Sequence, residues 1–461
     1  MYILDASAKE PLHIQLYKAL KEDIISNYSV EEKIPSIRKT ASLYNLSKTT
    51  VESAYTQLHA EGFLESFPKS AYRVSEMYQK EILSSKILKE NYVEKVEKKE
   101  IFKYDFFPAQ LTNDSFPLKL FKRLFNRAVG ESLDFGSYHN GAGEIELCQE
   151  IEKYLATSRG VSCSAEQIIV CSGFSDSMAL LARLVKEKYT HFGMEHPGYH
   201  VARRVFEEYG YKIENIKVSH NGISLSSLQN ANTKLIYTTP SHHYPTGVTT
   251  PVAKRQKILE YIHKIDGLII EDDYDSELSY KNRPIPAMQG LDEHDRVVYM
   301  GTFAKSLSPA LRVSYMVLPY HLLRNYKESY DAHFPRVSLP IQKTLALFLK
   351  EGHYERHVRK IRTLNRKKHN LMRELLKKNI GKSMDIVAQG GGLAILIHPK
   401  VAFDFEILKE EAKKKKIKLY FAKERSGGDF EALRMGFGGF SLEELPSAID
   451  AFSLIWKKAV L

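Results

Sequence analysis

Cysteine is scarce in this chain of 461 residues, which contains only Cys148, Cys163 and Cys171. Three widely spaced cysteines do not make a disulfide framework or a metal-binding cluster, so we expect neither. Thiols of this kind are typical of proteins in a reducing compartment, and they favour a cytoplasmic location.

Long apolar runs are also missing, and none is long enough to span a bilayer, so we expect no membrane association. Asp5, Lys9 and Glu10 interrupt the first residues, and we therefore expect no signal peptide. The composition, 43% hydrophobic and 27% charged, is typical of a soluble globular protein with an ample core. The length predicts two or three domains.

The net charge of +11 is unevenly distributed. Residues 1–75 hold nine Lys/Arg and nine Asp/Glu, whereas residues 356–378 hold ten Lys/Arg and one acid, Glu374. A basic helix of this kind is most often a solvated face, and a contact with DNA is the alternative interpretation.

The first 75 residues predict helices followed by a hairpin. PLHIQLYKALKEDIIS repeats leucine or isoleucine every four residues, which indicates one apolar stripe on a helix. Ser36 and Ser47 are candidate N-caps of two further helices. FLESFPKSAYRVS predicts two short strands around a turn at 68–71. This order predicts a winged helix-turn-helix.

A helix-turn-helix places its second helix in the major groove of DNA. Hydroxyls and cations at the start of that helix suit mixed phosphate and base contacts, and a basic wing suits backbone or minor-groove contacts. A winged helix that binds protein is the alternative. The candidate DNA-binding residues are Arg38, Ser47, Lys48, Thr49 and Thr50, with Lys69 and Arg73 in the wing.

The segments PLHIQLYKAL, KIPSIRKTA and LSKTTVESAYTQLHAEGFLES resemble the GntR family of bacterial regulators. Ala71 stands where the wing turn of that family usually has glycine, which adopts positive φ more cheaply. The neutral charge of this region predicts weak non-specific DNA binding by one copy alone.

Residues 76–103 are charged and of mixed sign, which predicts a linker. In residues 104–461 the strand-like runs QIIVCSG, KLIYTTP, GLIIEDD and RVVYMG alternate with amphipathic helical segments. This alternation predicts an α/β domain with a mainly parallel sheet. Basic helices followed by GGLAILIHP and ALRMGFGG predict a smaller α+β lobe from about residue 340.

The loop GTFAKSLSPALR, residues 301–312, holds Lys305 among small and hydroxyl residues. Acids follow another strand in GLIIEDDYDSEL, and CSGFSDSMAL leads through small residues into a helix that suits a phosphate. These parts suit pyridoxal 5′-phosphate. Its aldehyde forms a Schiff base with lysine, its pyridine nitrogen needs a carboxylate, and its phosphate needs N–H donors and an arginine.

Residues from about 104 onward resemble fold-type I aminotransferases through TPSHHYPTG, DDYDSEL and GTFAKSLSPALR, and the whole chain is similar to MocR/GabR-type regulators. The resemblance implies Lys305 as the Schiff-base lysine and Arg434 as the ligand of a substrate or effector carboxylate. It implies cofactor contacts from Asp272 at the pyridine nitrogen, Tyr274 at the phenolic oxygen, Arg312, Gly173, Phe174 and Ser175 at the phosphate, Tyr199 on the ring, and Tyr138 reaching the neighbouring subunit of a homodimer.

Some alternatives stay open at this point. Asp273 is an alternative partner for the pyridine nitrogen, and Tyr199 and Tyr138 are alternatively packing residues. Tyr244 stands where ordinary aminotransferases have an asparagine that tunes the ring oxygen, so efficient full transamination is less assured.

The sequence thus predicts a transcriptional regulator that binds operator DNA and senses an amino acid, an amine or pyridoxal 5′-phosphate itself through Lys305. The alternative is an active aminotransferase with an accessory DNA-binding domain. A third interpretation, a rear domain that only dimerises, is disfavoured by the set of Lys305, Asp272 and Arg312.

Overall fold

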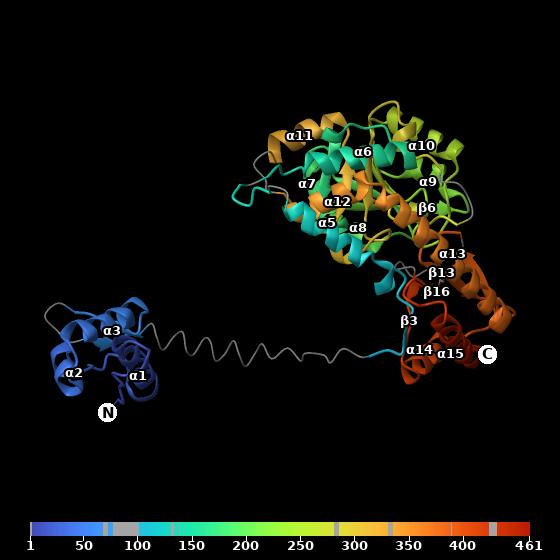
Figure 1. The fold of residues 1–461 in the computed structure, drawn as a ribbon. Coiled ribbons are helices and arrows are strands. Elements are labelled where there is room, and N and C mark those ends of the chain that lie inside the picture. The colour runs from blue at the N-terminus through green and yellow to red at the C-terminus, as the bar shows by residue number, and fades with distance from the viewer. Residues whose placement is uncertain are drawn as a thin grey trace. The chain divides into compact units, whose positions relative to one another are not determined.

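The structure is a computed structural model that describes residues 2–67, 72–76, 101–130, 133–137, 139–280, 285–330, 335–388, 390–423 and 431–461 (Figure 1). Lys69, Tyr138 and most of the predicted linker lie outside these residues. The chain divides into two compact units, Met1–Glu100 and Ile101–Leu461.

The N-terminal unit has the predicted order of helices and strands, with α1 Leu12–Asn27, α2 Ile37–Tyr44, α3 Lys48–Ala60, β1 Leu64–Glu65 and β2 Arg73–Val74. Both predicted caps are confirmed, because Ser36 Oγ accepts from the Lys39 amide and Ser47 Oγ from the Thr50 amide. The two strands pair antiparallel. One core joins the three helices to the hairpin, and it includes Leu16, Leu20, Ile24, Val51, Tyr55, Leu58, Leu64 and Val74.

The C-terminal unit is built on a sheet whose eight described strands have the order β4-β11-β10-β9-β8-β5-β6-β7. The strand β11 is antiparallel to both its neighbours and β7 is antiparallel to β6, while the other pairings are parallel. The bounds are β4 Ile168–Cys171, β5 His191–His196, β6 Lys212–Ser219, β7 Gly222–Ile223, β8 Leu235–Thr238, β9 Leu268–Asp272, β10 Val297–Thr302 and β11 Ser314–Val317.

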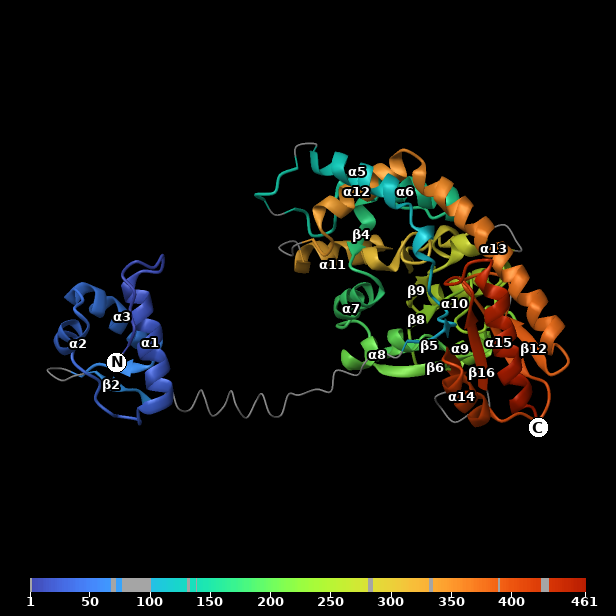
Figure 2. The same ribbon diagram turned by 60° about the horizontal axis from the view of Figure 1, so that its bottom comes forward.

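Helices cover both faces of this sheet (Figure 2). Leu235 and Tyr237 of β8 pack on the face of α7 Phe174–Leu184, α8 His200–Glu208 and α11 Tyr320–Tyr330, whereas Ile236 packs on the opposite face. The central strands read as continuous apolar runs because both faces are covered. The opposite face carries α5 Leu118–Gly130, α6 Ile145–Arg159, α9 Leu225–Asn230, α10 Val252–Lys264 and α12 Leu339–Lys350.

A smaller lobe follows, with a four-stranded sheet in the order β12-β13-β16-β15. Its core also takes in Phe106, which follows β3 Tyr104–Asp105, and β3 pairs with β14. The bounds are α13 His353–Ile380, β12 Met384–Ala388, β13 Ala394–Pro399, α14 Phe405–Lys414, β14 Ile417–Lys418, β15 Phe421–Lys423, β16 Glu431–Gly436 and α15 Glu444–Ala459. Short 3-10 turns lie at Asn113–Ser115, Ala165–Gln167, Ser276–Leu278, Gln289–Leu291 and Pro309–Leu311.

The helix α13 carries most of the basic segment identified in the sequence. Arg359, Lys360, Arg366 and Lys367 are exposed along it. Lys368 is instead buried, where its amine donates to the Gly438 carbonyl and burial lowers its pKa. None of the helices in the described ranges is long and apolar enough to cross a membrane.

Candidate functional site

The carboxyl ends of the parallel strands lie at one end of the large sheet, the place where ligands bind in α/β folds. Segments that follow five of these strands line a single cavity of about 1580 Å³. The residues they contribute include Gly173 after β4, Tyr199 after β5, Tyr244 after β8, Asp272 at the end of β9 and Lys305 after β10.

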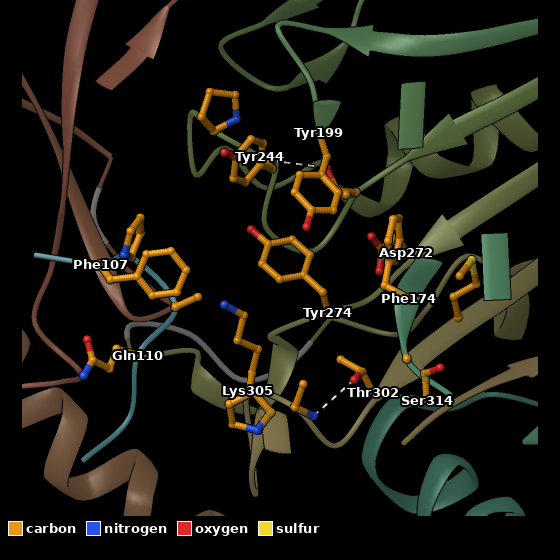
Figure 3. Close-up of a pocket in the computed structure, with 18 of the residues that line it drawn as sticks. Phe107, Gln110, Phe174, Tyr199, Tyr244, Asp272, Tyr274, Thr302, Lys305 and Ser314 are labelled. Atoms are coloured by element: carbon orange, nitrogen blue, oxygen red, sulfur yellow. Dashed lines mark hydrogen bonds between the residues drawn. The ribbon is translucent and has the colours of Figure 1, made fainter. Parts of the chain in front are cut away.

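Lys305 lies in the connection between β10 and β11, and its amine points into the cavity beside Tyr274 (Figure 3). Two hydrogen bonds shape the loop: the Phe303 amide donates to the Val313 carbonyl at 3.1 Å, and the Ala304 amide donates to the side-chain Oγ1 of Thr302 at 3.1 Å. Burial, and then the positive charge of Arg434, lower the pKa of Lys305 to about 8. A lysine with this pKa is a better nucleophile at neutral pH than an ordinary one.

The two consecutive acids after β9 have different surroundings. Asp272 lines the cavity and accepts a hydrogen bond of 2.6 Å from the Tyr237 hydroxyl. Asp273 points elsewhere, accepting from Arg159 Nε at 2.6 Å and from the Tyr299 hydroxyl at 2.7 Å. Burial alone would raise the pKa of Asp273, but Arg159 and Tyr299 hold it below its usual value. The geometry therefore favours Asp272 over Asp273 as the partner of a cation in the cavity.

Burial raises the pKa of Asp272 to about 7, although the Tyr237 hydroxyl opposes the shift. The folded protein therefore binds this proton more tightly than the unfolded chain, whose carboxyl has a pKa of 3.8. Asp272 should then stabilise the cofactor-free protein fully below pH 3.8, and lose this contribution as the pH rises to about 7. We expect thermal unfolding midpoints to fall across this window, and Asp272→Asn to flatten the fall.

Glu277 should contribute to the same pH dependence of stability, since burial raises the pKa of its carboxyl to about 7 as well. Part of the pH dependence should therefore remain in Asp272→Asn. An unchanged dependence in that variant would show that the Asp272 carboxyl is ionised at neutral pH.

Gly173 and Arg312 form a cradle at the start of α7. Gly173 is the N-cap of this helix with φ of +85°, and a Cβ placed on it would lie 2.4 Å from Arg312 Nη2. Glycine thus lets the guanidinium approach the first turn, where the leading N–H groups point out of the helix. Both the backbone N–H groups of this turn and the guanidinium of Arg312 are suitable hydrogen-bond donors to a phosphate. Phe174 also lines the cavity, whereas Ser175 is exposed and is not among its lining residues.

Aromatic rings form one wall of the cavity. The Tyr199 ring meets those of Phe174 and Tyr244 edge to face, with centroids 5.2 and 5.1 Å away. The Tyr274 hydroxyl donates to the His242 carbonyl at 3.0 Å. The rings of Tyr199 and Tyr274 face the same space as the Lys305 amine (Figure 3). A flat ligand between them would have aromatic contacts and a nearby phenol.

The structure also brings residues to the cavity that the sequence did not single out. Tyr237 lies within the strand-like run KLIYTTP, and its position one residue from the end of that strand is a usable signal. Segment 107–113 and the residues Tyr420 and Phe421 come to the cavity from far along the chain, and no local pattern marks them.

In the N-terminal unit, Arg38, Lys48 and Thr49 are exposed at the starts of α2 and α3. The hydroxyl of Ser47 is engaged as a cap, and it lies 2.7 Å from the hydroxyl of Thr50. Arg73 is half-buried in β2, where its guanidinium carbon lies 5.6 Å from the centre of the Phe67 ring. The start of α3 thus presents a cation and hydroxyls to solvent, as expected for a recognition helix.

Comparisons with known proteins agree with this division. Residues 12–74 match the family of bacterial regulatory proteins, gntR family, and residues 109–420 match aminotransferase class I and II. The chain is 34% identical over 455 residues to the uncharacterized HTH-type transcriptional regulator YdeL of Bacillus subtilis (strain 168), with 97% of each chain covered. It is 32% identical to the probable rhizopine catabolism regulatory protein MocR of Rhizobium meliloti, with 88% of this chain and 86% of the relative covered.

Among solved structures, an archaeal alanine:glyoxylate aminotransferase matches 82% of this chain and 95% of its own with a TM-score of 0.69 and 22% identity, which shows the fold. The chain therefore belongs to the MocR-type transcriptional regulators, in which a gntR-family helix-turn-helix is joined to a class I and II aminotransferase domain. The cofactor of this domain is pyridoxal 5′-phosphate. The amine of Lys305, the carboxyl of Asp272 and the Gly173–Arg312 cradle fit its aldehyde, pyridine nitrogen and phosphate.

Proposed function

We propose that this regulator senses a small amine, most simply an amino acid, through exchange of the Schiff base at Lys305. The observation that carries the proposal is one cavity lined by four residues: Lys305 and Arg312 from the β10–β11 connection, Asp272 from β9 and Arg434 from β16. Each suits a different part of the chemistry: covalent attachment, the ring nitrogen, the phosphate and an incoming carboxylate.

Pyridoxal 5′-phosphate supplies an aldehyde carbon that can pass from one amine to another. In this scheme Lys305 would hold the aldehyde carbon until an effector amine takes its place, and Arg434 would hold the effector carboxylate. The pKa of about 8 lets the released amine be neutral in part of the population at physiological pH. An effector changes operator binding only by the difference in its affinity for two conformations of the protein.

The experiment is a titration of the cofactor-loaded chain with a panel of amino acids and amines. Absorbance reports Schiff-base exchange, and fluorescence anisotropy with a duplex selected from a random-sequence library reports DNA affinity. A compound that changes both supports sensing. If no compound alters the absorbance while loading with pyridoxal 5′-phosphate itself changes DNA affinity, the cofactor is the signal instead.

The second candidate is an active aminotransferase with an accessory DNA-binding domain. The shared cavity of Lys305, Asp272 and Tyr274 favours it, whereas Tyr244 in place of asparagine argues against efficient turnover. Sustained release of a keto acid, in many equivalents per chain, would favour the aminotransferase function over the sensing function. Release of at most one equivalent would not.

We also propose that the chain works as a homodimer on two operator half-sites in the cytoplasm. Leu118 on α5 and Ile145 on α6 are exposed apolar residues, which supports their burial against a second copy. A dimer would bind DNA through two helix-turn-helix units at once, which would compensate for the weak binding expected from one neutral unit. Light scattering of the purified protein would measure the mass directly.

Arg38→Ala and Lys48→Ala are each expected to weaken binding to the selected duplex about 5- to 100-fold, since both cations are exposed at helix starts. If a residue contacts phosphate, the slope of log affinity against log salt should also fall by about one. Lys18 on α1, exposed and paired with Glu10, provides a matched control variant, Lys18→Ala. Equal losses in all three variants would indicate a general charge effect rather than a recognition helix.

The basic face of α13 is the remaining candidate for DNA contact. Charge reversal at Arg366 and Lys367, which are exposed, should reduce the salt slope of operator binding if this face approaches DNA. A slope equal to that of the unaltered protein would identify the face as solvated surface. Lys368 is left unaltered in this test, because it is buried and its substitution would affect folding.

A further inference from the structure

The guanidinium of Arg434 lies against an aromatic ring in the cavity. Arg434 is on β16 of the small lobe, and its guanidinium carbon is 4.1 Å from the centre of the Tyr244 ring. Within the described residues no carboxylate forms an ion pair with this guanidinium, and the cavity lining contains two acids, Glu207 and Asp272. The positive charge of Arg434 nevertheless reaches the reactive end of the cavity, since it lowers the pKa of Lys305.

A backbone hydrogen bond and neighbouring aromatic rings hold Tyr244, the partner of Arg434 in this contact, in place. Its amide donates to Thr239 Oγ1 at 3.2 Å, and Thr239 Oγ1 donates to the buried carboxylate of Glu195 at 2.7 Å. Its ring packs edge to face on the ring of Tyr199, which packs in turn on Phe174. The ring position is therefore fixed by backbone anchoring and by two further rings, all belonging to the large-sheet part of the unit.

A guanidinium has two faces and an edge, and these serve different partners. Its N–H edge binds a carboxylate with two hydrogen bonds, while its face stacks on an aromatic ring. A ring on the face fixes the guanidinium plane without occupying the donors. It also offsets part of the cost of leaving a partly buried cation without a counter-ion.

We infer that Tyr244 is a specificity-determining residue, which orients Arg434 by stacking so that the site prefers amines that carry a carboxylate over amines that do not. This inference rests on the proposed exchange at Lys305. It assigns a task to the tyrosine that replaces the asparagine of ordinary aminotransferases, whose amide could not stack in this way. The contact also joins the small lobe to the large sheet across the cavity.

The test compares two probes on the cofactor-loaded full chain, aminooxyacetate and methoxyamine. Both displace Lys305 from the Schiff base and form an oxime, but only aminooxyacetate carries a carboxylate. The ratio of their second-order rate constants, followed by absorbance, therefore reports carboxylate recognition alone. Tyr244→Phe should keep the ratio of the unaltered protein, Tyr244→Leu should lower it about 2- to 30-fold, and Arg434→Met should bring it close to one.

A second measurement does not involve exchange at all. Propionate, a carboxylate without an amine, should raise the thermal unfolding midpoint of the cofactor-loaded chain. Half-saturation should need more propionate in Tyr244→Leu by the same factor, and the rise should vanish in Arg434→Met. If Tyr244→Leu does not fold, Tyr244→Met takes its place, because it removes the ring and keeps an apolar side chain.

The outcomes separate this inference from the proposed function. A ratio and a propionate response that are unchanged in the variants without the ring would overturn the role of Tyr244, while oxime formation by both probes would leave exchange at Lys305 standing. Failure of the unaltered protein to form an oxime with either probe would instead overturn the proposed function. A loss in Tyr244→Phe equal to that in Tyr244→Leu would assign the effect to the hydroxyl and also contradict stacking.

Discussion

Alanine in place of Lys305 is expected to leave the purified protein without the absorbance of a Schiff base after incubation with pyridoxal 5′-phosphate. The physical reason is the loss of the amine that points into the cavity at the end of β10 (Figure 3). With a pKa of about 8, roughly one Lys305 amine in ten is unprotonated at pH 7, against roughly one in three thousand for an ordinary lysine. No other lysine lines the cavity within the described residues.

The measurement combines absorbance with mass spectrometry after borohydride reduction. The unaltered protein should gain one reduced adduct per chain, located on the peptide that contains Lys305, and Lys305→Ala should gain none. Lys186 is the matched control, since its amine donates to the Gly210 carbonyl and does not line the cavity. Lys186→Ala should load normally. An adduct that persists at full yield in Lys305→Ala would move the covalent site to another lysine.

Gly173→Ala is expected to raise the dissociation constant of pyridoxal 5′-phosphate about tenfold or more. A Cβ at this position would lie 2.4 Å from Arg312 Nη2, and the guanidinium at the end of a flexible side chain would move away. The φ of +85° adds about 1 kcal/mol of backbone strain for alanine. The first turn of α7 and the arginine could then no longer converge on one phosphate.

Fluorescence titration of the cofactor-free protein measures this dissociation constant, and circular dichroism checks the fold. Gly130→Ala is the matched control, because Gly130 ends α5 and a Cβ there meets no atom within 4 Å. It should bind the cofactor as the unaltered protein does. Normal affinity in Gly173→Ala would show that the phosphate does not lie between this glycine and Arg312.

Local signals in the sequence predicted local structure well. Ser36 and Ser47 cap their helices as expected, because a cap depends on the few residues that follow it. The apolar runs became β4, β8, β9 and β10, since a strand covered on both faces needs little else. The loops that carry Lys305, Asp272 and Arg312 could be placed at strand ends for the same reason.

Long-range placement could not be read in this way. Successive residues leave a strand in opposite directions, so a pair of adjacent acids does not tell which one faces the cavity. The neighbours decide it: Tyr237 from β8 meets Asp272, and Arg159 from α6 meets Asp273. The stacking of Tyr244 on Arg434 joins residues 190 positions apart in the chain, and no spacing rule anticipates it.

The antiparallel strand β11 has one more consequence. It lies between β10 and β4, so the connection that carries Lys305 after β10 returns Arg312 to the glycine that follows β4. The proposed covalent contact of Lys305 and the proposed phosphate contact of Arg312 thus come from the same short connection. The length of this connection sets the spacing between Lys305 and Arg312. Inserting a single residue between them would change that spacing, so the two side chains would no longer match the distance between the aldehyde and the phosphate of one cofactor molecule.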